Sequence, residues 1–263
     1  MRSIRTLASG LALAALAACD SQEVSTPTLP PTAAVRFINA VTDTGAVDIR
    51  MIDQIELSAV ANGLNFRSGT IHQLTESKAR HIRVFPTSTD INVATNALMD
   101  TTITIEANTR ITLLLTGSAR AGTLRFVTIP DDPSAPPANS IGVRVVNTAT
   151  GAVNGYLVES ATTPVAEPAA AANVGTLGAS PYVTRAAGSA AVRITEAGSA
   201  TVTASAAGPV ATVITGALPA AGVNSAGSKF TVYYFPRGVA GSPQNAVATP
   251  TAVWFVDRNP ADL

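Results

Sequence analysis

The chain has 263 residues, of which 46% are hydrophobic and 13% are charged. Its 17 basic residues balance its 17 acidic residues, so no net field draws the chain to nucleic acid phosphates, and we expect no nucleic-acid partner. The length exceeds the usual size of one domain, about 100–150 residues, and therefore predicts two domains.

Residues 1–18 have the pattern of a signal peptide. Arg2 and Arg5 precede a mostly apolar stretch over residues 7–18, which is shorter than the roughly 20 residues that a permanent membrane-spanning helix needs. The segment ends in Leu-Ala-Ala followed by Cys19, the one cysteine of the chain. This ending resembles the lipobox of bacterial lipoproteins, in which the cysteine thiol receives a diacylglycerol.

The resemblance implies that Cys19 becomes a lipidated N-terminal residue that holds the protein on a bacterial membrane, in the cell envelope. The alternative is an ordinary secretory signal that happens to carry a cysteine near its cleavage site. Asp20 follows the cysteine, and in enterobacterial lipoproteins an aspartate at this position resembles a signal for retention at the inner membrane. The rule does not transfer safely to other bacteria, so the choice between inner and outer membrane stays open. Residues 19–33 combine the cysteine with proline and small polar residues, a composition typical of a flexible linker.

The chain then breaks into strand-sized runs that stop at turn residues, and no helix-period segment stands out. In residues 34–130 the expected strands are Ala34–Val41, Val47–Ile52, Ile55–Val60, Arg80–Phe85, Thr101–Ala107, Arg110–Thr116 and Thr123–Ile129. Residues 131–140 are rich in proline, which cannot continue a central strand, so they predict a linker before a second domain over residues 141–263. We expect the two halves to fold independently.

The second half repeats the plan of the first. The matching segments are Val35–Ala40 with Val143–Thr148 (108 residues apart), Ile82–Val84 with Val192–Ile194 (110 apart) and Phe126-Val127 with Phe255-Val256 (129 apart). Two anchors at nearly one spacing indicate a duplication. The additional length of the second half predicts loops near residues 219–228 and 238–250. The sequence therefore predicts an all-β protein with two tandem immunoglobulin-like β-sandwich domains.

Three segments also carry a resemblance to a family. The opening Val-Arg-Phe-Ile-Asn-Ala, the triplet Ala46-Val47-Asp48 and the run Leu113–Gly117 resemble the domain-of-unknown-function 4397 family. The resemblance covers most of residues 34–130 and, more weakly, residues 141–258, where Asn154 replaces the aspartate of the triplet. It implies a bacterial envelope or extracellular β-sandwich protein, often with tandem domains, that has no established catalytic residues.

Catalytic and cofactor motifs find little support. His72 and His81 lie nine residues apart without a signalled third ligand, so we expect no metal site. The glycines of Gly175–Gly178 lack the lysine of a phosphate-binding loop, and no nucleophile elbow occurs. The acidic residues near the first turns are more simply solvated turn groups. We therefore expect no cofactor and no enzymatic activity.

Aromatic residues gather near the C-terminus. Tyr233 and Tyr234 are adjacent, so on a strand they face opposite ways, and Trp254 occupies the last strand. An outward ring could stack on a sugar or anchor a protein; the alternative is that these rings fill the core and cover a sheet face. The sequence thus favours a membrane-tethered structural or binding module whose partner is an envelope protein or glycan. The rival is a carbohydrate- or peptidoglycan-binding lipoprotein that uses these three residues.

Overall fold

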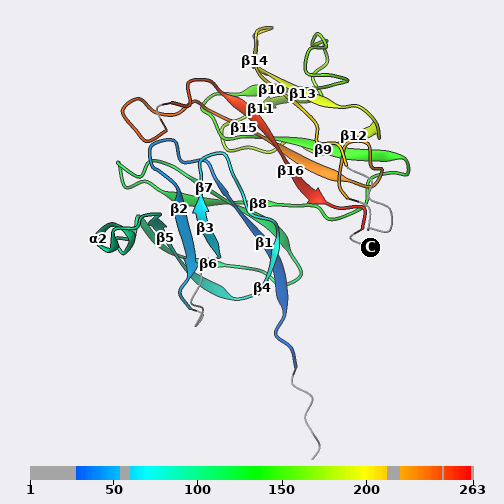
Figure 1. The fold of residues 1–263 in the computed structure, drawn as a ribbon. Coiled ribbons are helices and arrows are strands. Elements are labelled where there is room, and N and C mark those ends of the chain that lie inside the picture. Colours follow the sequence, from blue (N-terminus) through cyan, green and yellow to red (C-terminus); the bar gives the residue numbers. More distant parts are fainter. Residues whose placement is uncertain (1–27, 54–59, 212–219, 245, 262–263) are drawn as a thin grey trace, which may run out of the picture. The chain divides into compact units, whose positions relative to one another are not determined.

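The computed structural model describes residues 28–53, 60–211, 220–244 and 246–261, and its regular structure there is almost entirely β-strand (Figure 1). One short helix, α2 (Ile91–Ala94), interrupts the strands and begins at Asp90, whose side chain accepts a hydrogen bond from the Asn92 amide. None of the helices within these ranges is long and apolar enough to cross a membrane. The predicted strand at residues 55–60 and the signal peptide lie outside the described ranges, apart from Val60.

The first domain is a sandwich of two four-stranded sheets. The inner sheet has the order β4-β1-β7-β8, formed by Gln73–Glu76, Thr32–Asn39, Arg110–Thr116 and Arg125–Pro130. The outer sheet has the order β3-β2-β5-β6, formed by Ala61–Leu64, Val47–Met51, Ala79–Pro86 and Met99–Thr104. All neighbouring strands are antiparallel except β1 and β7, which are parallel.

The second domain repeats this arrangement strand for strand. Its inner sheet has the order β12-β9-β15-β16, formed by Val183–Ala186, Ser140–Asn147, Lys229–Phe235 and Thr251–Arg258. Its outer sheet has the order β11-β10-β13-β14, formed by Ala171–Val174, Val153–Val158, Ala191–Glu196 and Val202–Ala207. Here β9 and β15 form the parallel pair. The predicted all-β fold with two tandem immunoglobulin-like sandwiches is confirmed, and the repeated topology agrees with a duplication.

Because side chains alternate along a strand, each inner sheet has one face in the core of its own domain and the other face in a cluster between the domains. In β1, Val35 and Phe37 face the outer sheet of their own domain, whereas Ile38 belongs to a separate cluster shared with the second domain. In β15, Phe230 and Val232 fill the core of the second domain in the same way. The shared cluster consists of Ile38, Ala40, Phe66, Leu114, Ile129, Val146, Tyr233 and Phe235. The two inner sheets are therefore packed against each other as well as against their outer sheets.

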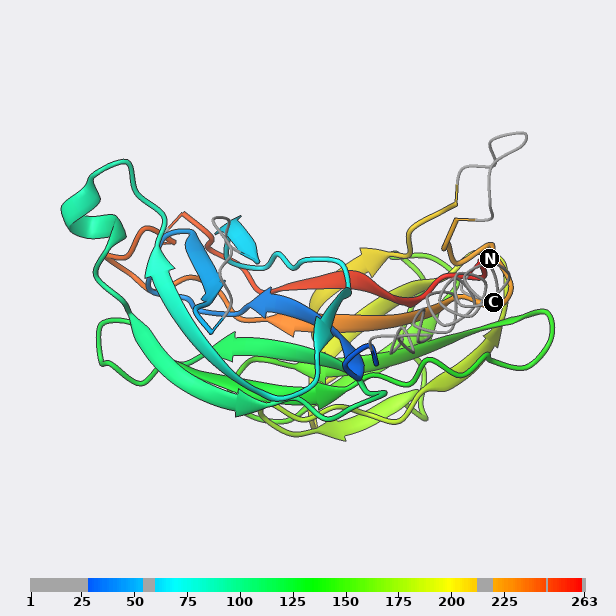
Figure 2. The ribbon, with the colours of Figure 1, turned by 90° about the horizontal axis from the view of Figure 1, so that it is seen from below.

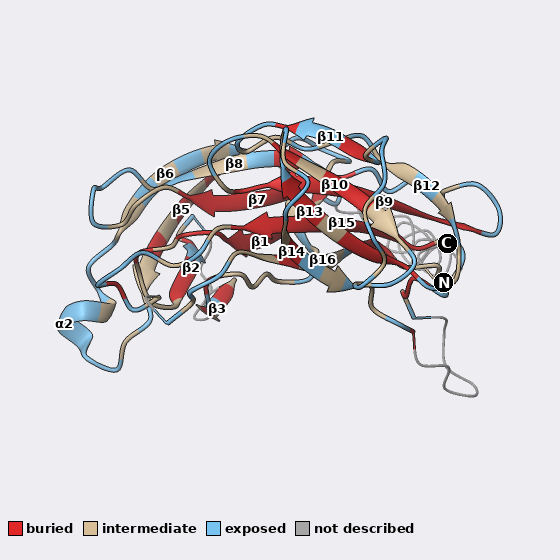
Figure 3. Ribbon diagram, turned by 90° about the horizontal axis from the view of Figure 1, so that it is seen from above, coloured by how far each residue is buried: buried red, intermediate tan, exposed pale blue. Residues whose placement is uncertain are grey.

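This packing explains why the central strands are buried along nearly their whole length. Every residue of β9 and β15 is buried, and only Arg110 of β7 is not, which gives the red band of Figure 3. A strand covered on both faces has no solvent side. Residues 31–263 accordingly form one compact unit, and Figure 2 shows strands of both domains stacked in it. Independent folding of the two halves stays a prediction, and the shared cluster means that each half would expose an apolar face when alone.

The closing strands align differently from the sequence match. Thr112 pairs with Ile129 in the first domain, and Thr231 pairs with Phe255 in the second. Phe255 therefore corresponds to Ile129, 126 residues earlier, and the match of Phe126 with Phe255 was wrong by three positions. Phe126 packs instead beside Phe37, with ring centroids 5.8 Å apart, in the core of the first domain.

Gly69 lies where the first domain meets β16. A Cβ atom built on it would lie 2.8 Å from both Ile38 Cγ1 and the Phe255 ring, closer than packed carbons approach. We expect Gly69→Ala to lower the free energy of unfolding by about 1–3 kcal/mol, the usual effect of overpacking. The control is Gly45→Ala, because nothing lies within 4 Å of its added Cβ. Equal urea midpoints for the two variants would contradict close packing at Gly69.

Candidate functional site

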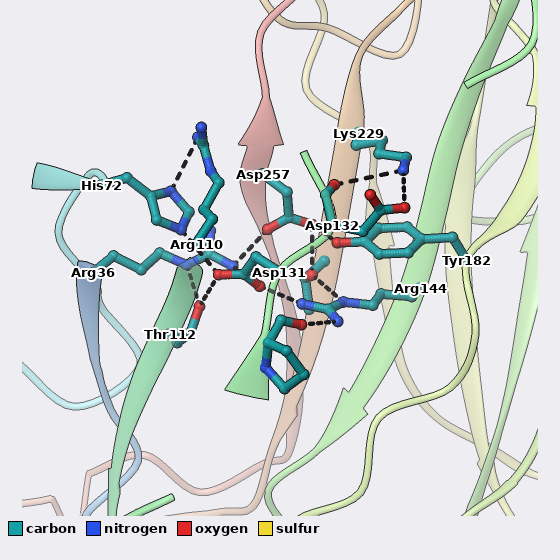
Figure 4. Close-up of polar contacts among 12 residues, drawn as sticks. Arg36, His72, Arg110, Thr112, Asp131, Asp132, Arg144, Tyr182, Lys229 and Asp257 are labelled. Atoms are coloured by element: carbon teal, nitrogen blue, oxygen red, sulfur yellow. Dashed lines mark hydrogen bonds and ion pairs between the residues drawn. The ribbon is translucent and has the colours of Figure 1, made fainter. Parts of the chain in front are cut away.

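A buried network of charged side chains lies between the two inner sheets (Figure 4). Arg36 of β1 is 1% exposed. Its Nε donates to Thr112 Oγ1 at 2.6 Å, within its own domain. Its other nitrogens donate to the second domain, to Asp257 Oδ1 at 2.5 Å and to the Val256 carbonyl at 3.0 Å. An arginine of one sandwich is thus neutralised by a carboxylate of the other.

Arg144 of β9 repeats this pattern in the opposite direction. Its Nε donates to Thr231 Oγ1 at 2.7 Å, within the second domain, and it also donates to the Pro130 carbonyl at 2.8 Å. It forms an ion pair with Asp131 of the first domain, whose side chain is fully buried. Each arginine therefore binds a threonine of its own sheet and the aspartate and preceding carbonyl of the partner sheet.

The carboxylates are held in turn by their own domains. Thr112 donates to Asp131 Oδ2 at 2.7 Å, and Thr231 donates to Asp257 Oδ2 at 2.6 Å. His72, just before β4, contacts Asp131 at 2.9 Å, and Tyr182, just before β12, donates to Asp257 at 2.8 Å. The network accordingly has two related halves, with His72 in one and Tyr182 in the other.

Charge pairing sets the titration of these groups. Burial opposes the charge of Asp131, but the hydrogen bond from His72 and the charges of Arg36 and Arg144 outweigh it and hold the pKa of Asp131 below its ordinary value. Burial, with the positive charges of Arg36 and Arg110, lowers the pKa of His72 despite Asp131. Burial and Asp257 raise the pKa of Tyr182. The folded state thus keeps Asp131 charged and His72 neutral at neutral pH.

The aromatic residues that the sequence singled out are covered rather than displayed. Tyr233 is 0% exposed and packs beside Phe255 between the inner sheets, and Tyr234 is 4% exposed in the core of the second domain. Trp254 is partly buried against Phe230, and its Nε1 donates to the Ala206 carbonyl at 3.3 Å. Neither tyrosine offers an outward ring, because β15 is covered on both faces, and both fill the protein interior as the alternative interpretation has it.

The other residues considered for chemistry stay apart. Cys19 lies outside the described residues. His81 sits on the exposed face of β5 and pairs with Asp100, whereas His72 pairs with Asp131, so the two histidines have different partners. No group of three or more histidine, cysteine or acidic side chains that could hold a metal ion occurs within the described ranges. The charges that do converge, Asp131 and Asp257, are already bound by arginine.

An open cleft of about 770 Å³ lies at one end of the contact between the domains. The first domain contributes the segment after β1 and the start of β8, and the second domain contributes the segment after β9 and the loop between β15 and β16. Two arginines line the cleft, Arg125 and Arg237, together with several threonines. This volume is in the range of ligand-binding sites, which makes the cleft the best candidate for binding.

The loop between β15 and β16 forms one wall of the cleft and bonds to the first domain. The Val239 amide donates to the Thr42 carbonyl at 3.1 Å, and Gln244 Nε2 donates to the Thr44 carbonyl at 2.9 Å. Arg67 of the first domain donates to the Pro236 and Thr249 carbonyls at 2.5 and 2.6 Å. The loop that the sequence predicts at residues 238–250 is thus part of the domain contact.

Removal of Arg36 tests the buried network. Arg36→Met keeps the length of the side chain but leaves Asp257 without its main counter-charge, and breaking a buried ion pair from one side costs about 3–5 kcal/mol. The control is Arg83→Met, whose partner Asp100 is 45% exposed, as an exposed pair contributes at most about 1 kcal/mol. Urea unfolding measures both variants. Equal losses would contradict the central role of Arg36.

The titration of His72 makes a second test. Because the pKa of His72 is lowered by folding, the unfolded chain takes up the proton first, and stability should fall as the pH drops below about 6.5. His72→Gln cannot take up this proton, so its stability should change less between about pH 7.5 and about pH 5.5. His81 is present in both proteins and serves as the internal control. Identical pH dependence in urea unfolding would refute the assignment.

Comparison with known proteins gives one family match and a similar solved structure. No curated protein matches the chain. Among solved structures, one similar chain is a crystal structure of CBMbc (family CBM26) from Eubacterium rectale Amy13K in complex with maltoheptaose. It has 13% identity and a TM-score of 0.25, with 86% of this chain and 95% of that chain covered. Residues 33–156 match the family described as "Domain of unknown function (DUF4397)", so the predicted resemblance to that family is confirmed.

Proposed function

We propose that the protein is a non-catalytic binding module of the bacterial cell envelope, held on a membrane by a lipid on Cys19, and that it presents the interdomain cleft to a ligand. The observation that carries this proposal is the position of the cleft along β1. The tether enters at Thr32, the first residue of β1, whereas Ala40, just past its last residue, lines the cleft. At about 3.3 Å per residue, the strand separates the two points by about 25 Å.

The buried network supports the binding role because it fixes the walls of the cleft. Each guanidinium in the interface has lost water and is compensated by a carboxylate of the other domain. Sliding or opening of the sandwiches would separate these pairs in a medium of low dielectric constant. A cleft that is already formed loses less conformational entropy when a ligand binds.

A hydrolytic function has less support. A pair of carboxylates can act as acid and base only if substrate reaches them, and the buried pair Asp131 and Asp257 is closed off between the inner sheets. The rival hypothesis, carbohydrate binding through Tyr233, Tyr234 and Trp254, is weakened by the burial of the two tyrosines. Binding at the cleft does not depend on these rings.

The tether can be tested directly, because Cys19 is the one thiol of the chain. In a bacterial host, the wild-type protein should incorporate labelled palmitate and remain with membranes after an alkaline wash. Cys19→Ala should incorporate no label. Mass spectrometry of the extracted protein should find a diacylated Cys19 as the first residue. An unmodified thiol, or cleavage at another peptide bond, would overturn the tether.

A further inference from the structure

The cleft differs from the rest of this neutral protein in its charge. Arg125 and Arg237 line it, both are exposed, and neither side chain has a hydrogen-bond or ion-pair partner among the described residues. Arg67 and Arg120 donate to backbone carbonyls of the β15–β16 loop, which forms one wall of the cleft. Two guanidinium groups therefore line the cleft, and two more contact the loop that forms its wall.

The acidic groups nearby are few. The lining includes no aspartate or glutamate within the part of the chain that the structure describes. Asp43 follows the lining residue Thr42, and it is 6% exposed and accepts hydrogen bonds from the Ser118 hydroxyl and from the Ala119 and Arg120 amides. Because the Asp43 carboxylate is already hydrogen-bonded to residues 118–120, it does not neutralise Arg125 or Arg237. The cleft thus carries a positive charge that an anionic ligand can pair with.

The remaining lining is polar but uncharged. Thr42 and Thr150 occupy equivalent positions of the duplication, and neither hydroxyl makes a hydrogen bond to another described residue. Hydroxyl groups can donate to and accept from the hydroxyls of a sugar, and guanidinium groups bind carboxylates through two parallel hydrogen bonds. The cleft also opens to solvent between two domains, so a chain can lie across it.

From these features we infer that the cleft binds an acidic glycan, a sugar chain with carboxylate groups, in which Arg125 and Arg237 pair with the carboxylates and the threonines bind sugar hydroxyls. The inference deepens the proposed function and rests on it for the ligand-presenting role of the cleft. The two arginines come from different domains, so one ligand bridges both.

Binding of hexagalacturonate to the full-length protein, extracted from membranes in detergent, tests the inference by titration calorimetry. We expect one site per chain, weaker binding at high salt, and no binding of the neutral maltohexaose. Arg125→Gln and Arg237→Gln should each weaken binding at least about tenfold, and the double variant should abolish it. Thermal midpoints should stay unchanged because both side chains are exposed. The matched control is Arg50→Gln, an exposed arginine on the outer sheet of the first domain, which should bind like wild type.

Several outcomes would overturn the inference: no binding of hexagalacturonate, equal binding of maltohexaose, or the same affinity in the double variant. Binding of inorganic phosphate as tight as that of hexagalacturonate would leave a simple anion site and would also overturn the glycan assignment. The tether is judged separately. If the protein carries the lipid on Cys19 but does not bind the glycan, the cleft assignment is refuted. If the protein binds the glycan but mass spectrometry finds no lipid on Cys19, the tether is refuted and the cleft assignment stands.

Discussion

The structure depends on the exchange of arginines between its two domains. Arg36 and Arg144 are buried charged groups, and removal of a guanidinium from water costs several kcal/mol unless a partner compensates it. The main partner, Asp257 for Arg36 and Asp131 for Arg144, belongs to the other domain in both cases. An apolar contact alone could slide, because dispersion and apolar burial have little directional preference. The paired arginines form their bonds in only one alignment of the two inner sheets, and this alignment fixes the positions of the cleft walls.

The repeated segments that are visible in the sequence contain both arginines, but the role of these arginines between the domains could not be predicted. Arg36 and Arg144 were part of the repeated Val-Arg pattern that indicated the duplication. In a strand, however, an arginine between two apolar residues is typical of a solvent-facing position. The residues around Arg36 and Arg144 give no sign that a second sheet covers that face. Asp131 was placed in a proline-rich linker for the same reason, although its side chain lies at the centre of the network.

The same covering explains why neither adjacent tyrosine is exposed. Alternation correctly placed Tyr233 and Tyr234 on opposite faces of β15. The hypothesis of an exposed tyrosine requires that one face of the sheet containing β15 is open to solvent. The strand is in fact the centre of a stack in which both faces are buried. The apolar and aromatic run Phe230–Phe235, in which Thr231 is the one exception, was the signal for this, since strands buried on both faces lose the polar alternation.

The two domains differ in one connection that lines the cleft, and this difference bears on which ligand the cleft can select. The β7–β8 connection of the first domain spans residues 117–124, whereas the β15–β16 connection of the second spans residues 236–250 and reaches the first domain through Val239 and Gln244. A strict repeat would place related walls on both sides of the domain contact. The longer loop instead adds Arg237 on the side of the second domain, whereas Arg125 of β8 lines the side of the first, and Thr42 and Thr150 keep their equivalence in the duplication. The repeated parts therefore supply a rigid frame, and the inserted loop adds a second positive charge by which a ligand can be selected.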